Sequence, residues 1–325
     1  MTGVGIHVRE ISVDYPRRGS SPLRAVQDIS LDIPGGTTLA LIGESGSGKS
    51  TIARSICGLV QTSAGAISVG EMTIGRGSSA PQRAGRAGVQ LVAQDSTSAL
   101  DPRWPVWRSI AEPARIMRRL SKAALRDLAV ESLRDVGLSP DVANRLPRQL
   151  SGGQRQRVNI ARALAANARV LVLDEAVSAL DISVRNEILF LLDKLRSEHR
   201  LTYLFITHDM GPVVQLADHV AVLYLGGVVE SGPVSEVVLN PQHPYSRALI
   251  DAVPVIGGYP DSTQRIGETD DPGNRPEGCW FHRRCPHAKP ICKTEIPRTQ
   301  RFANRLIACH RAGEFERTNS QGGQQ

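Results

Sequence analysis

Residues 43–51, Gly-Glu-Ser-Gly-Ser-Gly-Lys-Ser-Thr, constrain the fold of this 325-residue chain more than any other segment. They fit the pattern G-x-x-x-x-G-K-[ST], with an apolar strand-like run before them (37–42) and a helical pattern after them, from Lys49 to about Leu59. Such a loop curls so that successive N–H groups point inward, and the helix N-terminus adds positive dipole. We call residues 43–51 the phosphate loop. Its members are predicted to bind a nucleotide's phosphates: Gly43, Glu44, Ser45, Gly46, Ser47, Gly48, Lys49, Ser50 and Thr51.

Strand-like and helical patterns alternate along most of the chain. Strands are expected at 6–13, 37–42, 66–70, 88–92, 170–173, 202–206, 219–224 and 227–232. Helices are expected at 154–166, at 183–198 and from about Asp209, and residues 103–136 suggest a charged helical insert with a break at Ser121. Residues 75–85 have the composition of a turn. The alternation predicts an α/β fold with a parallel sheet wrapped on both faces.

A pair of carboxylates follows a buried strand, in Val-Leu-Val-Leu-Asp174-Glu175. In this topology the carboxyl ends of the strands lie beside the phosphate loop. Asp174 and the Ser50 hydroxyl then suit Mg²⁺, while Lys49 can reach the β- and γ-phosphates. Glu175 points the other way, where it can polarise a water for attack on the γ-phosphate. We therefore expect ATP and Mg²⁺ as cofactors.

Between these elements lies Leu150-Ser-Gly-Gly-Gln154, and here the chain resembles the ATPase subunits of ABC transporters over roughly residues 6–235. Taken singly, Tyr15, Gln94 and His208 would be ordinary packing, solvated or capping residues. The resemblance implies that Tyr15 stacks on adenine, that Gln94 senses Mg²⁺ and contacts a transmembrane partner, and that His208 contacts the γ-phosphate. The remaining implied nucleotide contacts are Ser151, Gly152, Gly153, Gln154 and Asp181, the last in the segment 178–181.

The same resemblance implies pairing with a second ATPase subunit. In this family the signature segment 150–154 contacts the ATP of another ATPase domain, so that two domains close head-to-tail around two ATPs. With one phosphate loop and one signature, this chain is expected to pair with another chain, and a paralogue is favoured over a second copy. Further expected partners are two transmembrane permease subunits and an extracytoplasmic substrate-binding protein.

Other segments are similar to the oligopeptide/dipeptide and nickel importer branch. They are the run from Gln94 to Arg103, the segment Asp-Glu-Ala-Val-Ser-Ala-Leu-Asp at 174–181, and Asn-Pro-Gln-His-Pro-Tyr-Ser-Arg-Ala-Leu at 240–249. The implied function is ATP hydrolysis that powers peptide import, with nickel or metal-chelate import as the alternative. Ala93, Ser96 and Arg148 depart from the branch's usual residues at the membrane-subunit contact and before the signature.

Four of the five cysteines crowd near the end of the chain: Cys279, Cys285, Cys292 and Cys309. The resemblance implies that they hold a [4Fe–4S] cluster. Structural zinc uses the same soft ligands but lacks its usual short spacing here, and free thiols remain the third possibility. Cys57, on the helix after the phosphate loop, is expected to be a small buried core residue.

Composition limits the other functions. The formal net charge of +7 and a basic C-terminal region permit nucleic-acid or ribosome binding, but aromatic residues make up only 4% and there is no recognition motif, so no nucleic acid is expected. No apolar run is long enough to span a bilayer, and the N-terminal segment carries charge where a signal peptide would be apolar. We expect a peripheral protein on the cytoplasmic face of the cell membrane.

Together these patterns predict two parts. Residues 1–240 form an ATP-binding domain with a P-loop NTPase core, a β subdomain and a helical signature subdomain at about 96–155. Residues 241–325 form a C-terminal extension that carries the four cysteines. Its tail is expected to be disordered from about residue 312.

Overall fold

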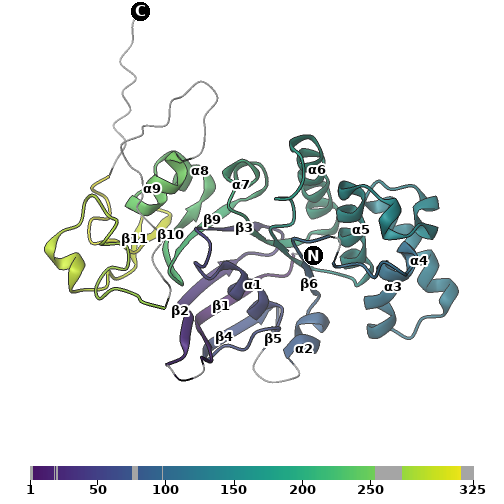
Figure 1. The fold of residues 1–325 in the computed structure, drawn as a ribbon, viewed down its shortest axis with the longest axis horizontal. Helices are drawn as coiled ribbons and strands as arrows, with labels where there is room; N and C mark the ends of the chain where they lie inside the picture. The colour runs from purple at the N-terminus through teal and green to yellow at the C-terminus, as the bar shows by residue number, and fades with distance from the viewer. Residues whose placement is uncertain are drawn as a thin grey trace, which may run out of the picture.

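The computed structural model describes residues 3–17, 19, 21–74, 80–96, 98–252 and 273–315. A large sheet runs through the middle of the molecule (Figure 1). A smaller antiparallel sheet lies below it in this view, a helical end lies on one side, and the C-terminal extension lies on the opposite side. The phosphate loop lies in the middle part, where β3 (Thr38–Ile42) leads into α1 (Lys49–Ile56).

The large sheet has eight strands among the described residues, in the order β11-β12-β10-β9-β3-β8-β7-β6. Pairing is parallel from β9 through β3, β8 and β7 to β6, and antiparallel at the other end. The expected parallel sheet is therefore the central part of a mixed sheet. Besides β3, its strands are β6 (Val89–Val92), β7 (Val170–Asp174), β8 (Thr202–Ile206), β9 (His219–Tyr224), β10 (Gly227–Pro233), β11 (Gln300–Phe302) and β12 (Arg305–Ile307).

Both faces of this sheet are buried, which explains its continuous apolar strands. In β3, Ala40 and Ile42 pack into the core on one face, while Leu39 and Leu41 pack into the core on the other. The first face is covered by helices that include α5 (Gly152–Ala165), α6 (Ile182–His199) and α7 (Met210–Leu216). The second face is covered by α1 and the small sheet.

The small sheet has the order β2-β1-β4-β5. Its main pair joins β1 (Ile6–Tyr15) to β2 (Leu23–Ile33). The sequence patterns predicted a strand at 6–13 but none at 23–33. The other two strands are β4 (Ala64–Val69) and β5 (Met72–Thr73). The sheet brings Tyr15, at the end of β1, beside α1.

The charged insert forms two helices, α3 (Val106–Met117) and α4 (Lys122–Asp135). Ser121 caps α4, because its hydroxyl accepts a hydrogen bond from the Ala124 N–H (3.2 Å). Two short 3₁₀ turns follow, at Pro140–Asn144 and Pro147–Gln149. Together with α5 these helices form the helical end in Figure 1.

The expected turn at 75–85 is wrong in part. Residues 80–86 form the helix α2 (Ala80–Arg86), and residues 75–79 lie outside the described part. Ala, Gln and Arg are good helix formers, and the buried Ala84 anchors this helix to the core of the small sheet. The glycine and serine content of this segment therefore does not keep residues 80–86 from forming a helix.

The helix α8 (Val234–Leu239) precedes the extension, which begins with α9 (Pro244–Asp251), and residues 273–315 then return to the large sheet through β12. The tail expected to be disordered from 312 is ordered as far as Phe315, which is buried between the guanidinium groups of Arg247 and Arg311. The rest of that tail, 316–325, lies outside the described residues. In the part of the chain that is described, no helix combines the length and apolarity needed to cross a bilayer.

Candidate nucleotide site

The backbone of the phosphate loop requires glycine where it turns. Gly43 has φ +149° and Gly48 has φ +102°, in the region that side-chain-bearing residues rarely adopt. A Cβ at Gly43 would lie 2.2 Å from the carbonyl oxygen of Leu223 on β9. The loop therefore fits tightly against the sheet and opens into the N-terminus of α1, where Gly48 stands as N-cap.

Lys49 lies folded into this loop. Its Nζ donates hydrogen bonds to the carbonyl oxygens of Gly43 and Glu44, both at 2.7 Å, and to Ser47 Oγ at 3.2 Å. Burial lowers the pKa of Lys49, and nearby carboxylates, Glu175 first, act in the opposite direction. The arrangement supplies a desolvated cation at the predicted phosphate position.

Ser50 and Asp174 lie together as predicted. The Ser50 hydroxyl donates to Asp174 Oδ1 at 3.1 Å, across the gap between α1 and the end of β7. Burial raises the pKa of Asp174, although the Ser50 hydrogen bond lowers it. A hydroxyl and a carboxylate are hard oxygen ligands of the kind Mg²⁺ prefers, so this pair fits the expected cation.

The structure brings the three predicted catalytic residues together at the carboxyl ends of β6, β7 and β8. Gln94 Nε2 donates to Glu175 Oε2 at 2.9 Å, and His208 Nδ1 lies 3.4 Å from Glu175 Oε1. His208 is largely exposed, whereas Glu175 is mostly covered. This group lies one residue beyond Asp174, where a water attacking the terminal phosphate can be polarised.

Tyr15, the expected adenine-stacking residue, lies beside the first turn of α1. Its hydroxyl and the Thr51 hydroxyl are 3.3 Å apart. Its ring packs at the edge of the small-sheet core and is half-buried. An aromatic face is thus available beside the phosphate loop.

The signature residues lie on other elements. Ser151 and Gln154 form a capping box at the start of α5, with bonds of 3.2 and 3.1 Å. Asp181 caps α6 by accepting from the Val184 N–H at 3.0 Å. Gly153 faces α6 so closely that a Cβ would lie 2.5 Å from Val184 Cγ1. In Figure 1, α5 lies with the helical end, whereas α1 lies in the middle of the molecule.

Sequence reasoning missed the contacts that the extension makes with Glu44. Arg284 donates to both Glu44 carboxylate oxygens, at 2.7 and 2.9 Å. The hydroxyl of Tyr245 accepts the Glu44 N–H at 2.9 Å. These partners lie 201 and 240 residues from Glu44 in the sequence, so neither contact leaves a local sequence signal.

The four C-terminal cysteines line one common cavity: Cys279, Cys285, Cys292 and Cys309. All are free thiols, and backbone N–H groups donate to the sulfurs of Cys292 and Cys309, both at 3.4 Å. Burial raises the pKa of Cys279 to about 11 and that of Cys309 to about 11. Across the described residues, no three His, Cys, Asp or Glu side chains converge as ligands of a single metal ion would.

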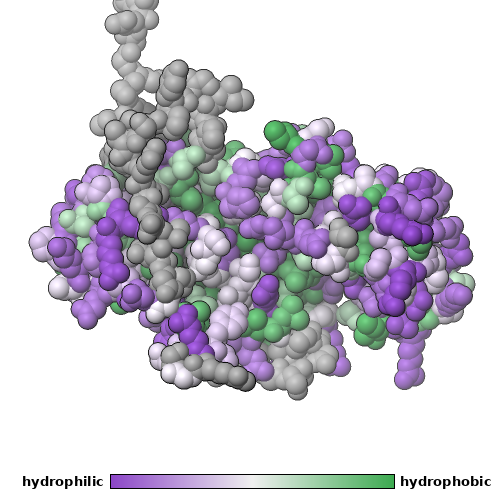
Figure 2. All heavy atoms as spheres, in the orientation of Figure 1, coloured by the Kyte–Doolittle hydropathy of each residue, from purple (hydrophilic) through white to green (hydrophobic). Residues whose placement is uncertain are grey.

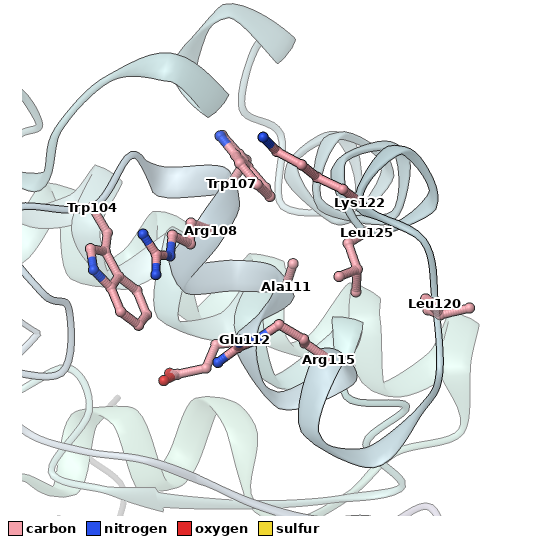
Figure 3. A pocket seen from close by; sticks show the side chains of 9 residues that line it. All are labelled: Trp104, Trp107, Arg108, Ala111, Glu112, Arg115, Leu120, Lys122 and Leu125. Atoms are coloured by element: carbon pink, nitrogen blue, oxygen red, sulfur yellow. The ribbon is translucent and has the colours of Figure 1, made fainter.

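A groove of about 370 Å³ lies on the helical end (Figure 3). Trp104 faces the guanidinium of Arg108, 4.0 Å from its ring centroid, on one side of the groove. The other residues that line the groove are Trp107, Ala111, Glu112, Arg115, Leu120, Lys122 and Leu125. Glu112 is paired with Arg162 at 2.6 Å, which leaves the groove apolar with a basic rim.

Comparisons with known proteins identify the family of this chain. Residues 26–178 match the ABC transporter family, and residues 229–292 match the C-terminal region of oligopeptide/dipeptide transporters. The chain is 40% identical to the di/tripeptide transport ATP-binding protein DppF of Pseudomonas aeruginosa, over 92% of this chain and 93% of that protein. It is 41% identical to a probable D,D-dipeptide transport ATP-binding protein, DdpF, of Escherichia coli, over 96% and 100%.

A solved structure shares the fold. The dimeric structure of MJ0796, a bacterial ABC transporter cassette, has a TM-score of 0.62 and 28% identity, over 70% of this chain and 98% of that one. The expected fold class, a P-loop ATPase with a C-terminal extension, is confirmed by these matches. The chain therefore belongs to the ATP-binding proteins of ABC transporters, with the C-terminal region of the oligopeptide/dipeptide transporters.

Proposed function

We propose that this protein hydrolyses ATP to power the import of oligopeptides or dipeptides through separate membrane subunits. The observation that carries the proposal is the union, in one chain, of the assembled Ser50–Asp174 and Gln94–Glu175–His208 groups with the oligopeptide/dipeptide transporter region. Relatives named as dipeptide transport ATP-binding proteins support it over most of both chains. The names of these two relatives refer to dipeptides and not to nickel, which favours peptide as the substrate.

The site residues have distinct proposed roles. Lys49 binds the β- and γ-phosphates, and Ser50, Asp174 and Gln94 hold Mg²⁺. Glu175 takes the proton of the attacking water, and His208 orients the γ-phosphate. The remaining proposed contacts are Tyr15 with adenine, the backbone of 43–48 with the phosphates, and Ser151, Gly152, Gly153, Gln154 and Asp181 with the nucleotide of a partner subunit.

A second ATPase subunit completes this proposal. Ser151 and Gly153 lie at the start of α5, an element apart from α1, so their phosphate contacts are assigned to a partner. The dimeric MJ0796 cassette, which has the same fold, supports this assignment. We favour a paralogue as the partner, with the chain held at the cytoplasmic face of the membrane.

The groove on the helical end is our proposed docking site for a permease segment. It follows Gln94 by only ten residues, to Trp104, so a segment seated there is connected to the catalytic group through a short stretch of chain. Two tryptophans offer apolar contact, and Arg115 and Lys122 offer positive charge. The matching segment would present an apolar side chain flanked by acidic ones.

Affinity purification from native membranes tests the transport function. We expect the tagged chain to bring down a second ATPase subunit, two permease subunits and a binding protein that retains peptides. Recovery with a nickel-binding protein instead would favour the alternative substrate. Recovery of ribosomes or nucleic acid in place of membrane subunits would contradict the proposal.

The cysteine cavity supports a [4Fe–4S] cluster as a further resident group. Structural zinc usually takes cysteines two to four residues apart, whereas five, six and sixteen residues separate these four cysteines in turn. Four thiols around one cavity, two of them already accepting N–H groups, are the set of soft ligands that such a cluster uses. The cluster would join separate points of the extension into one unit.

Metal analysis of anaerobically purified protein checks this assignment. We expect brown protein with about four irons and matching sulfide per chain. The Cys279→Ser variant should lose most of the iron, whereas Cys57→Ser, remote from the cavity, should keep it. Colourless protein that contains about one zinc per chain, or no metal, would contradict the cluster.

A further inference from the structure

The C-terminal extension contacts the phosphate loop at Glu44, a position where the motif allows any residue. The motif specifies glycine, lysine and hydroxyl positions but accepts any residue directly after Gly43. In this chain that residue is Glu44, a carboxylate beside the proposed polyphosphate site. An unpaired negative charge there would repel the phosphates. A cation that pairs with Glu44 would remove this repulsion.

Arg284 of the extension provides that neutralisation. Its Nη2 and Nη1 donate to Glu44 Oε1 and Oε2 at 2.7 and 2.9 Å, a two-pronged contact that only arginine forms. The Arg284 side chain is 6% exposed, and Nη1 also donates to the hydroxyl of Tyr224 at 3.3 Å. Because the guanidinium is fixed by its surroundings, it sets the position of the more exposed Glu44.

Glu44 is also held through its backbone. Its N–H donates to the hydroxyl of Tyr245, whose ring packs against Tyr224 and Phe281 with centroids 4.7 and 5.4 Å away. Its carbonyl accepts the Lys49 ammonium at 2.7 Å. A displacement of Glu44 would therefore displace the lysine that reaches the phosphates.

The turn that carries Arg284 also carries two of the cavity cysteines. The Arg284 N–H donates to the Phe281 carbonyl at 3.1 Å, inside the segment that begins at Cys279 and ends at Cys285. Both cysteines line the shared cavity, and the Cys279 N–H donates to the Cys292 carbonyl at 2.9 Å. The conformation of this turn thus fixes both the thiols and the guanidinium.

We propose that Arg284 is a positioning residue for the nucleotide: it neutralises and orients the Glu44 carboxylate, which otherwise repels the phosphates beside Lys49, and it makes ATP affinity depend on the cysteine-bearing turn. The proposal rests on ATP binding at the phosphate loop and adds a control of that site by the extension. In this proposal the extension acts on nucleotide affinity and not only on the stability of the fold.

A mutant cycle in the full chain tests the contact. We expect Arg284→Gln to weaken ATP and ADP binding by about tenfold, because Glu44 then keeps an unpaired charge beside the phosphates. Adding Glu44→Gln should restore affinity to within about threefold of the parent, because the repelling charge is gone. The control is Arg283→Gln, the same change at the exposed neighbouring position, which should leave affinity unchanged.

Equilibrium competition against a fluorescent ATP analogue gives the affinities, and calorimetry gives Tm for each variant. Unchanged affinity in Arg284→Gln at unchanged Tm would overturn the proposal, as would a loss that Glu44→Gln fails to rescue. If Arg284→Gln does not fold, Arg284→Lys is used in its place. Its loss of ATP affinity should be smaller, because the positive charge stays and only the two-pronged contact with Glu44 is lost. Parent-like affinity in that variant would also overturn it. A parent chain that binds no ATP would instead refute the proposed function.

A separate experiment tests whether the cysteine-bearing turn affects ATP binding. Cys285→Ser should weaken ATP binding in the same direction as Arg284→Gln, and the two changes together should cost no more than the larger one alone. Arg283→Gln, at an exposed position of the same turn, again serves as the control. Fully additive losses, or no loss in Cys285→Ser, would show that the turn does not act through Arg284.

Discussion

At the scale of single residues, the backbone of Glu175 explains how the proposed catalytic residues Gln94, Glu175 and His208 are brought together. Glu175 has φ +50°, a left-handed conformation that side-chain-bearing residues seldom adopt. Its N–H donates to the Ile206 carbonyl at 3.0 Å, and its carbonyl accepts the N–H and hydroxyl of Ser178. These bonds hold the strained residue so that its side chain lies between Gln94 and His208.

Replacing Glu175 by Gln should stop turnover while keeping nucleotide binding. The amide keeps the size and one acceptor of the carboxylate but cannot take a proton, so ATP hydrolysis should fall by about 10² or more. ATP affinity should stay within about threefold, because Lys49 and Ser50 are untouched. Phosphate release and equilibrium binding measure the two effects.

The control is Glu187→Gln, the same change at an exposed residue of α6. It should hydrolyse ATP at the parent rate. Near-normal hydrolysis by Glu175→Gln would mean that another group activates the water.

Cys57 should be chemically silent in the folded protein. It is 8% exposed at the C-terminal end of α1, buried as predicted from the sequence, and burial raises the pKa of its thiol to about 12. At neutral pH almost no thiolate forms, and the thiolate is the reactive species. Iodoacetamide followed by peptide mapping should leave Cys57 unmodified in native protein and modify it fully in denaturant. Rapid labelling of the native protein would contradict the burial of this thiol.

At the scale of elements, the sequence predicted those whose pattern is continuous. The apolar runs of β7 and β8 and the Ser121 break between α3 and α4 are found close to their expected places. The strand β2 was missed although Leu23–Ile33 alternates, with Val26, Ile29, Leu31 and Ile33 buried. Bulges in its pairing with β1 interrupt that period and weaken the signal.

Some contacts of the candidate site could be predicted from local sequence patterns, and others could not. Lys49, Ser50, Asp174 and Glu175 lie at the ends of predicted elements, so strand order alone brings them together. Arg284 and Tyr245 reach Glu44 from an irregular segment and a short helix. Their placement depends on the packing of the whole extension, which has no local pattern.

The groove beside α3 gives a prediction for the helical end. Ile116, Met117 and Leu120 are exposed there, and in Figure 2 apolar side chains show at the lower edge of this otherwise hydrophilic end. Leu120→Asp should reduce co-purification of the permease by about tenfold, because it places a charge in the apolar contact. ATP binding by the isolated chain should not change.

Leu239→Asp is the matched control, since Leu239 is an exposed leucine on α8, outside the helical end. It should keep the permease bound. Equal loss of the permease in both variants, or no loss in Leu120→Asp, would remove the groove from the interface.

At the scale of the whole molecule, the core lies between two parts with different proposed contacts. The helical end carries the signature residues and the groove, and the extension with its cysteines lies at the other end (Figure 1). Gln94 connects Glu175 to the chain that leads to the groove, while Glu44 connects the phosphate loop to the extension. ATP binding and hydrolysis can therefore be coupled to partners on one side and to the cysteine cavity on the other.

The most direct test of the central claim is peptide uptake by the reconstituted transporter. The chain, its co-purified ATPase partner, the permease and the binding protein are placed in vesicles, and uptake of labelled dipeptide is compared with uptake of nickel. We predict peptide uptake that requires ATP and falls at least about tenfold with Glu175→Gln. Uptake that continues unchanged with that variant, or uptake of nickel without peptide, would contradict the account.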